Sequence, residues 1–313
     1  MNKNSKIYIA GHTGMVGSSI LRLLKRKGYY NIIVKSSSEL NLISQIDVEN
    51  FFKTHQPEYV FLAAAKVGGI HANNTFRGEF VYENIMIQSN VIHQSYLNNV
   101  KKLLFLGSSC IYPKLSKQPI KEEYLLSGKL EETNRPYAVA KITGIEMCKS
   151  YREQYASNFI SLMPTNLYGP NDNYHPDNSH VFASLIRKFV IGKRDNIESI
   201  NIWGSGNPKR EFLHVDDLAD ASVFLMNNHD GKNIVNVGWG EDISIRDLSF
   251  LIKEVSGYEG EVKFDLTKPD GTPRKLLNTD RIHKLGWEPK IKLREGIKKT
   301  IEDFINNEKT YCF

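Results

Sequence analysis

The sequence predicts an α/β protein, a Rossmann-type doubly wound parallel sheet with a smaller, interleaved α/β lobe for a substrate. Three observations predict this fold. A glycine-rich loop at residues 11–17 separates an apolar run of strand length from a helical pattern at the start of the chain. Apolar runs and helical patterns then alternate to about residue 170, which is typical of βαβ units. Beyond that point the alternation becomes irregular, apart from one apolar run at 234–238.

The composition is that of an ordinary globular protein. The 313 residues are 41% hydrophobic and 24% charged, and the net charge of +6 comes from 41 basic and 35 acidic side chains scattered along the chain. No apolar stretch approaches the length of a membrane span, and no basic and aromatic residues interleave as in a nucleic-acid platform. The sequence therefore predicts neither a membrane nor a nucleic-acid partner, whereas small anionic ligands fit the mild positive charge.

The three cysteines, Cys110, Cys148 and Cys312, are far apart and odd in number. They lack metal-ligand spacing, so we expect reduced thiols and no bound metal. The first residues lead directly into a strand, without the apolar region of a signal peptide. Together these observations predict a cytoplasmic protein.

The strand at residues 7–10, the glycine loop and a helix running to about residue 27 form the start of a βαβ unit. Such glycines permit a tight turn, close approach of the backbone to a pyrophosphate, and close helix packing. The amino end of the helix then faces the phosphates. An ordinary glycine-rich turn is the alternative, but the position between strand and helix favours a bound dinucleotide. The expected contacts from this loop are Gly11, Thr13, Gly14, Met15, Val16 and Gly17.

The second strand, at residues 32–35, indicates which dinucleotide is bound. Its end normally meets the adenosine ribose, where an acid selects NAD and a basic or hydroxyl-rich turn accommodates the 2′-phosphate of NADP. Here Lys35, Ser36 and Ser37 follow one another, and no acid appears before Glu39. The pattern favours NADP(H), although a polar surface turn would have the same composition. The residues expected to line the adenine pocket are Asn41 and Leu42.

Two later strands should complete the ligand-binding edge of the sheet. The apolar run at 59–65 ends in small residues, among them Ala64, that would let a cofactor approach closely. The run at 160–164 is followed by residues 165–170. Open α/β sheets bind ligands at the carboxyl ends of their strands, so we expect both segments to face the site.

The chain divides into two interleaved regions. Residues 1–170, with about 214–239, are expected to form the NADP-binding domain, because 234–238 looks like a strand that returns to the main sheet. About 171–213 and 240–313 are expected to form the substrate-binding lobe. A helical pattern at about residues 80–97 could join the helix that bears Tyr137 in an intersubunit bundle, which would give a homodimer, or pack within one subunit.

Tyr137 and Lys141 are four residues apart in a helical pattern, so they share a helix face and can point at one spot. A phenol with a pKa near ~10 is a poor acid, and a neighbouring cation should lower that pKa. Ser108, just after the strand at 103–106, could hydrogen-bond the oxygen that the phenol protonates. This trio suits proton transfer at a carbonyl or alcohol. Alone, the spacing fits a half-buried Tyr and a solvated Lys, but the glycine loop favours catalysis.

These residues together resemble the extended short-chain dehydrogenase/reductase superfamily, with its markers Gly11-x-x-Gly14-x-x-Gly17, Ser108 and Tyr137-x-x-x-Lys141. Longer strings resemble one member family, the GDP-L-fucose synthases, which act as GDP-4-keto-6-deoxymannose 3,5-epimerase/4-reductases. The strings that carry this resemblance are residues 63–70, 107–113, 163–170, 178–181, 210–217 and 268–275, and the resemblance covers nearly the whole chain.

The resemblance implies an NADPH-dependent enzyme that epimerises a GDP-linked 4-keto-6-deoxy sugar at C3 and C5 and then reduces C4. The sugar could be the hexose precursor of GDP-L-fucose or a related deoxyheptose. Cys110 and His180 match the family's base and acid, while Tyr137 and Ser108 would hold the C4 oxygen. Lys141 would also bind the nicotinamide ribose. Without the resemblance, Cys110 would be interpreted as a small buried thiol and His180 as a polar residue at a helix start.

The resemblance also implies further ligand contacts in both regions. The cofactor would be held, in addition, by Ala64, Leu106, Gly107, Pro164, Asn166, Leu167 and His180. The GDP-sugar would be held by Ser109, Asn166, Val181, Leu185, Lys188, Trp203, Arg210, Asp270 and Lys275. Aromatic and cationic groups of this kind suit a nucleotide diphosphate.

Two positions depart from the family pattern. The family often places an Arg in the glycine loop, where this chain has Thr13, and a second Arg after the second strand, where this chain has Ser37. Both would contact the 2′-phosphate of NADP, and Lys35 with residues 36–38 could substitute for them.

Two other hypotheses stay open. One is a C4 reductase that acts on a GDP-4-keto-6-deoxyheptose already epimerised by another enzyme. The other is a non-catalytic, dinucleotide-sensing protein. Intact Ser108, Tyr137 and Lys141 argue against the second hypothesis, because a sensor needs no proton donor.

Overall fold

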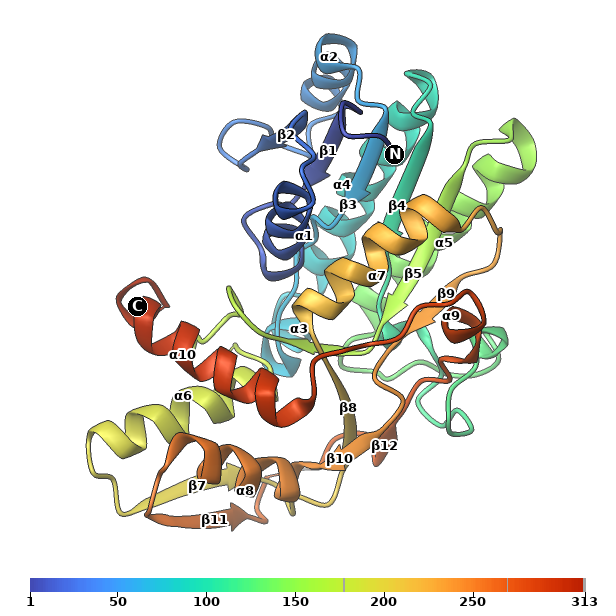
Figure 1. Cartoon of the computed structure of the whole chain (residues 1–313). Helices are drawn as coiled ribbons and strands as arrows, with labels where there is room; N and C mark the ends of the chain where they lie inside the picture. Colours follow the sequence, from blue (N-terminus) through green and yellow to red (C-terminus); the bar gives the residue numbers. More distant parts are fainter. Residues whose placement is uncertain (177, 269, 312–313) are drawn as a thin grey trace.

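A six-stranded parallel sheet lies at the centre of the larger part of the molecule in the computed structural model (Figure 1). In sheet order its strands are β2 (Ile32–Lys35), β1 (Ile7–Ala10), β3 (Tyr59–Leu62), β4 (Lys102–Leu106), β5 (Phe159–Pro164) and β9 (Val235–Val237). Every neighbouring pair is parallel. The predicted Rossmann-type α/β fold is confirmed, and β9 is the returning strand expected near residue 236.

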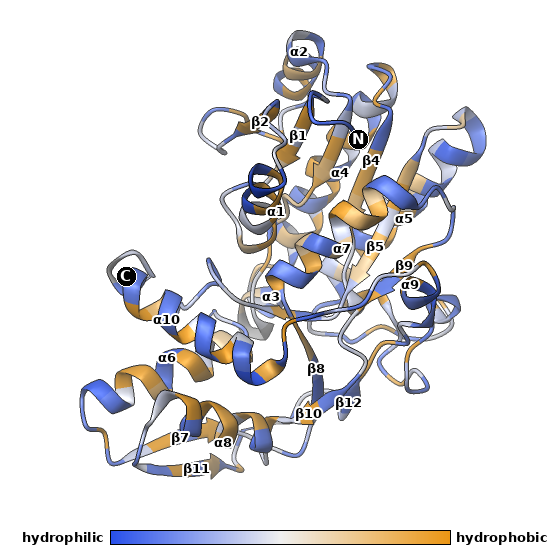
Figure 2. Ribbon diagram, viewed as in Figure 1, coloured by the Kyte–Doolittle hydropathy of each residue, from blue (hydrophilic) through white to orange (hydrophobic). Residues whose placement is uncertain are grey.

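Helices cover both faces of this sheet. One face carries α1 (Met15–Arg26) and α7 (Val215–Asn228), and the other carries α2 (Gln45–His55), α4 (Arg77–Leu97) and α5 (Arg135–Tyr155). Successive strand residues alternate between faces, so Ile9 belongs to the first core and Tyr8 to the second. Strands buried on both faces have continuous apolar sequences, which is why the central strands are mostly orange in Figure 2.

The smaller part has its own core. Helices α6 (Val181–Arg194), α8 (Ile245–Ser256) and α10 (Leu293–Tyr311) enclose buried aromatic and aliphatic side chains, Phe182 and Phe304 among them. Strands β7 (Ser199–Trp203) and β11 (Glu261–Asp265) form a two-stranded parallel sheet beside these helices. The boundaries of the two regions, at about residues 171, 213 and 240, stay a prediction.

Strand β8 (Lys209–His214) runs between the two parts (Figure 1). Its first half pairs with β10 (Asp242–Ser244) and β12 (Arg274–Lys275), and its second half pairs with β6 (Asn166–Tyr168). One strand therefore joins segments from distant parts of the chain. The remaining elements are α3 (Ile70–Thr75), η1 (Ser109–Ile111), η2 (Glu122–Tyr124) and α9 (Asp280–Lys284).

The structure describes residues 1–176, 178–268 and 270–311. Cys110 and Cys148 are buried, free thiols, and Cys312 lies outside the described residues. Within the described part of the chain, no helix has both the length and the apolar content that crossing a membrane requires.

Candidate functional site

The glycine loop leaves space where a dinucleotide pyrophosphate would lie. Gly11 has φ +85°, and a Cβ there would stand 2.7 Å from the backbone of Ala64. A Cβ on Gly17 would stand 2.1 Å from the Gly11 carbonyl oxygen, so no side chain fits. At Gly14, which caps α1, a Cβ would meet only that oxygen, at 3.6 Å. The amino end of α1 is thus open, and its unpaired N–H groups fit a bound pyrophosphate.

The other predicted cofactor residues lie at the carboxyl ends of neighbouring strands. Ala64 lies just beyond β3 and faces Gly11, while Leu106 is the last residue of β4 and Gly107 follows it. A Cβ on Gly107 would stand 2.3 Å from the sulfur of Met163, so the backbone of β4 packs closely against β5. The remaining ones are Pro164 at the end of β5, and Asn166 and Leu167 on β6.

The turn after β2 differs from the sequence-based expectation. Glu39 folds back over it, and its Oε2 accepts hydrogen bonds from the Ser36 N–H at 2.8 Å and the Ser36 hydroxyl at 2.7 Å. The Lys35 ammonium lies 3.3 Å from the other carboxylate oxygen. The hydrogen bond from the Ser36 backbone, and then the other contacts, lower the pKa of Glu39 to about 2. Lys35 and Ser36 are therefore already engaged by a carboxylate, while Ser37 is exposed.

The sequence contained a signal for this fold-back. Ser36-Ser37-Ser38-Glu39 has the spacing of a capping box, in which a Glu three residues after a Ser reaches back to the backbone N–H of that Ser. On the same turn Asn41 is exposed, with its side-chain oxygen bound to the Ile43 N–H at 3.1 Å, and Leu42 is partly buried against the core.

Four of the predicted catalytic residues meet at the carboxyl end of β4. The Ser108 hydroxyl caps η1 by accepting the Cys110 N–H at 3.3 Å. Lys141 points from α5 to the same place, because its ammonium donates to the Leu106 carbonyl at 2.9 Å and lies 5.8 Å from the centre of the Tyr137 ring. Tyr137 and Lys141 thus share the helix face that their spacing predicts.

The expectation that Lys141 lowers the pKa of Tyr137 is wrong for this structure. Burial, and then the charge of Cys110, raise the pKa of Tyr137. Burial also lowers the pKa of Lys141 to about 8, so its positive charge is less secure near neutral pH than that of a solvated lysine. A raised pKa keeps the phenol protonated, which is the state that a proton donor needs.

Lys275 lies close enough to both Cys110 and His180 to affect the pKa of each. Burial raises the pKa of the Cys110 thiol, and the neighbouring Lys275, Ser108 and Lys141 oppose that increase. Burial, and then the charge of Lys275, lower the pKa of His180. Part of the His180 side chain is nevertheless exposed to solvent. Since Lys275 influences both groups, these three side chains belong to one region. The Gly69 N–H, which donates to the Asn178 carbonyl at 3.0 Å, holds the loop before His180.

The predicted substrate cations stand on neighbouring strands. Arg210 of β8 and Lys275 of β12 are direct register partners. A Cβ on Gly271 would lie 3.0 Å from the Arg210 guanidinium, so the loop before β12 runs close past this side chain. Asp270 accepts hydrogen bonds from the Ser205 N–H at 2.9 Å and the Ser205 hydroxyl at 2.6 Å, and so fastens the loop.

The other predicted substrate residues differ in accessibility. Trp203 is 67% exposed, with the Lys268 ammonium 5.4 Å from its ring centre, and Val181 is 39% exposed. The Lys188 ammonium donates to the Asn201 carbonyl at 2.8 Å. Leu185 is only 2% exposed, within the core of the smaller part, and Ser109 is 3% exposed, so these two side chains offer almost no surface to a ligand.

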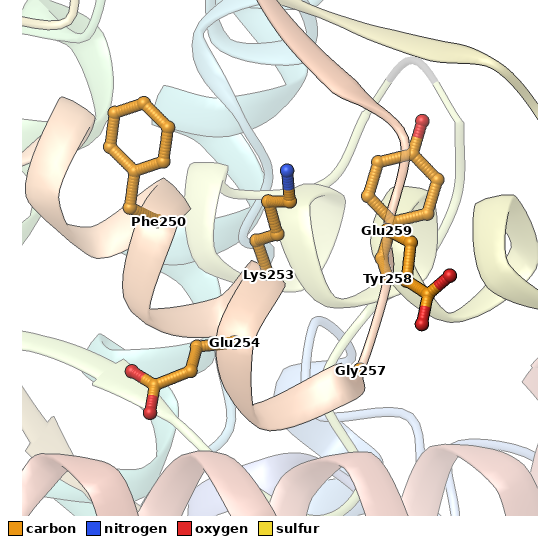
Figure 3. Close-up of a pocket in the computed structure, with 6 residues that line it drawn as sticks. All are labelled: Phe250, Lys253, Glu254, Gly257, Tyr258 and Glu259. Atoms are coloured by element: carbon orange, nitrogen blue, oxygen red, sulfur yellow. The ribbon is translucent and has the colours of Figure 1, made fainter.

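A hollow of about 380 Å³ lies at the carboxyl end of α8, lined by Phe250, Lys253, Glu254, Gly257, Tyr258 and Glu259 (Figure 3). None of these is a predicted site residue. Lys253 donates to the Gly260 carbonyl at 2.7 Å, and Glu254 accepts from Arg294 at 3.0 Å. Because these charged groups already have partners within the protein, the hollow is not a competing candidate for the chemistry.

Comparison with known proteins connects this geometry to a family. A family model described as the NAD dependent epimerase/dehydratase family matches residues 7–238. GDP-L-fucose synthase 1 of Arabidopsis thaliana is 54% identical over 98% of this chain and 95% of its own length. GDP-L-fucose synthase of Escherichia coli K12 is 51% identical over 97% of each chain. The resemblance to GDP-L-fucose synthases is thereby confirmed.

A solved structure extends this comparison. MlghC, the GDP-mannoheptose C4 reductase of Campylobacter jejuni, solved with NADP bound, superposes with a TM-score of 0.90. It is 42% identical and covers 97% of this chain and 99% of its own. The fold is therefore similar over nearly its full length to a structure that holds the expected dinucleotide.

Proposed function

We propose that this chain, which belongs to the NAD dependent epimerase/dehydratase family, is an NADP-dependent 3,5-epimerase/4-reductase of the GDP-L-fucose synthase type. Its substrate is a GDP-4-keto-6-deoxy sugar, in the first instance GDP-4-keto-6-deoxymannose. The observation that carries the proposal is the meeting of Ser108, Cys110, Tyr137 and Lys141 at the end of β4, in a chain more than half identical to such synthases.

The cofactor is NADP(H), which when bound supplies a hydride to C4 of the sugar. The open amino end of α1 at Gly14 would hold the pyrophosphate, and the Lys141 ammonium would hold the nicotinamide ribose. Tyr137 would give its phenolic proton to the C4 oxygen as that oxygen becomes an alkoxide. Its raised pKa keeps that proton available over the whole physiological pH range. Ser108 would fix the same oxygen by a hydrogen bond.

Epimerisation uses the acidity of the C3 and C5 protons, both of which are α to the C4 carbonyl. Cys110, as thiolate, would remove a proton from one face, and His180 would return one to the other face. Ser108 and Tyr137 would stabilise the enolate oxygen meanwhile. Lys275 favours the thiolate of Cys110 and opposes a second positive charge on His180. Ser108 and Tyr137 would therefore act in both epimerisation and reduction, so one site could catalyse the two reactions.

The second candidate function is C4 reduction without epimerisation, and the likeness to the heptose reductase MlghC favours it. Identity to that reductase is 42%, against 54% and 51% to the two GDP-L-fucose synthases, so epimerase/reductase activity is the better-supported function. The decisive test is incubation of the wild-type protein with GDP-4-keto-6-deoxymannose and NADPH in deuterated water, followed by proton NMR. GDP-L-fucose carrying deuterium at C3 and C5 supports the proposal. Turnover without deuterium at either carbon would make the protein a C4 reductase.

We further propose that residues 1–170 with about 214–239 bind NADP(H), and that 171–213 and 240–313 bind the GDP-sugar. Strand β9 supports the first assignment, because it belongs to the main sheet. The separate core around Phe182 and Phe304 supports the second. Buried free thiols at Cys110 and Cys148 support a reducing compartment such as the cytoplasm.

The homodimer is proposed to form through α4 and α5. The aromatic side chains of Tyr96 and Tyr155 stack across these helices with ring centres 4.3 Å apart, and Tyr151 hydrogen-bonds His93 at 2.8 Å. Tyr82 on α4 is 59% exposed. Exposed aromatic groups along two long helices are typical of a surface that a second copy covers.

Cofactor preference gives the first prediction. The kcat/KM for NADPH should exceed that for NADH, since no carboxylate immediately ends β2. Glu39 is nevertheless ionised beside Lys35 and Ser36, and it would repel a 2′-phosphate. Glu39→Gln should therefore raise the NADPH-to-NADH ratio of kcat/KM several-fold. The control is Glu49→Gln, which breaks a comparable exposed ion pair on α2 and should leave the ratio unchanged. A wild-type protein with a higher kcat/KM for NADH than for NADPH would contradict the predicted cofactor preference.

Substrate binding gives the second prediction. Arg210→Ala and Lys275→Ala should each raise the KM for the GDP-sugar and leave NADPH affinity nearly unchanged. Hydrogen bonds to charged groups contribute roughly 1.5–3 kcal/mol, which corresponds to about a tenfold to hundredfold increase in KM. The control is Lys263→Ala on β11, an exposed lysine paired with Glu261 at 3.1 Å. Equal weakening of both ligands would instead indicate a general disturbance of the fold.

A further inference from the structure

Glu211 on β8 is a fully buried carboxylate that none of the steps above uses, with 0% of its surface exposed. One carboxylate oxygen accepts the Gly240 N–H at 2.7 Å, and the other accepts the Leu277 N–H at 3.0 Å. Its main-chain carbonyl accepts the Asn166 side-chain amide at 2.8 Å. One residue thus binds three segments that are distant in the sequence.

Two of these three segments carry residues predicted to bind the GDP-sugar, Asn166 and Lys275. Leu277 comes two residues after Lys275, and β12 pairs with β8 over only two residues, so the Glu211–Leu277 hydrogen bond continues the attachment where the strand ends. Glu211 itself follows Arg210 directly. Its carboxylate packs against Gly238, where an added Cβ would lie 2.2 Å from a carboxylate oxygen, so no side chain fits at that position.

We propose that Glu211 is a positioning residue for the GDP-sugar: its carboxylate fixes the segment that carries Lys275 beside Arg210, and its carbonyl fixes Asn166. The identity of the ligand rests on the proposed function. Two carboxylate oxygens are needed, because each serves a different N–H group. A glutamine has one acceptor oxygen, and its amide group would face the second N–H with no hydrogen bond to make.

The competing interpretation is that Glu211 only stabilises the fold. Other contacts also hold the same segment, since Gln118 accepts the Leu276 N–H at 2.9 Å and Ile120 donates to the Leu276 carbonyl at 2.7 Å. If they suffice, Lys275 keeps its place without Glu211. Asp217 on α7 supplies a matched control, because it is 3% exposed and accepts the Ile291 N–H at 2.9 Å, and so holds a segment that carries neither Arg210 nor Lys275.

The test compares Glu211→Gln with Asp217→Asn in the full-length protein, using calorimetry with GDP and with NADPH as separate probes. The Glu211 variant should bind GDP at least about tenfold more weakly and bind NADPH with unchanged affinity. Its KM for the GDP-4-keto sugar should rise more than its kcat falls. The Asp217 variant should show a lower melting temperature and wild-type affinity for GDP.

Glu211→Asp provides a second variant that retains both acceptor oxygens on a shorter side chain. Its GDP affinity should lie between those of the wild type and the Gln variant, and it carries the comparison alone if the Gln variant does not fold. GDP affinity within about twofold of wild type in the variants, or parallel loss of GDP and NADPH affinity, overturns the positioning role. GDP binding needs no turnover, so a wild type that binds GDP but leaves the ketone unchanged would contradict the proposed function alone.

Discussion

Replacing Tyr137 with Phe should abolish most of the C4 reduction while leaving NADPH binding intact. The substitution removes only the hydroxyl that would protonate the C4 oxygen, and general acid catalysis typically contributes ~10²–10⁴-fold to a rate. The edge contact between the Tyr137 and Phe80 rings, whose centres are 6.3 Å apart, would remain. The measurement is the rate of NADPH oxidation at saturating GDP-4-keto sugar, together with NADPH affinity by fluorescence.

Tyr155→Phe is the matched control for this experiment. Tyr155 lies on the same helix, is 43% exposed, and stacks on Tyr96 instead of facing β4. Losing its hydroxyl should leave the rate within about twofold of wild type. A loss of less than about threefold in Tyr137→Phe would remove Tyr137 from the role of proton donor, given the usual contribution of such a group.

Substitution of Cys110 or His180 should greatly slow the cleavage of the carbon–hydrogen bonds at C3 and C5 of the sugar. Cys110→Ser replaces a thiol, whose ordinary pKa is about 8.5, by a far weaker acid, so the deprotonated base becomes scarce. His180→Gln removes the group that would return a proton on the opposite face. Each variant should lose deuterium incorporation at C3 and C5 by about 10²-fold or more. Reduction of the unepimerised ketone to a different sugar could continue slowly, and NMR of the product in deuterated water would detect it.

The pH dependence of deuterium exchange at C3 and C5 gives an independent check on the role of Cys110 as the base. Because burial raises the pKa of this thiol, the thiolate is a minor species at neutral pH, and the exchange rate should increase with pH through and beyond the ordinary thiol range. Cys148→Ser is the control, since this thiol is 1% exposed in the second core and should not affect exchange. Deuterium incorporation that survives in Cys110→Ser would exclude Cys110 as the base.

Most of the features that the sequence predicted correctly are local ones. The glycine loop and the strands at its sides are contiguous, and strands buried on both faces appear as unbroken apolar runs. Tyr137 and Lys141 share a face because they are four residues apart on a helix. These patterns depend on short-range geometry, which the order of residues determines directly.

The features that the sequence did not predict depend on tertiary surroundings. The pKa of Tyr137 rises because the folded chain buries the phenol, and no spacing of residues reports that burial. Lys275 affects the pKa of Cys110 although the two residues are 165 positions apart in the sequence, because the folded chain brings them close together. The fold-back of Glu39 onto Ser36 is an exception, because it is local and the Ser36-x-x-Glu39 spacing is that of a capping box.

The two parts that β8 connects are completed at different times while the chain is being synthesised. Tyr168 and Phe304 belong to one core, so that core cannot close until the ribosome has made almost the whole chain. Strands β1 to β5 and their helices precede it, and the earlier part of a chain generally folds first during translation. A nascent chain would therefore expose the glycine-loop edge of the main sheet before the smaller part is complete. Early capture of the nucleotide would stabilise that intermediate by mass action and protect it from aggregation while α10 is still being made.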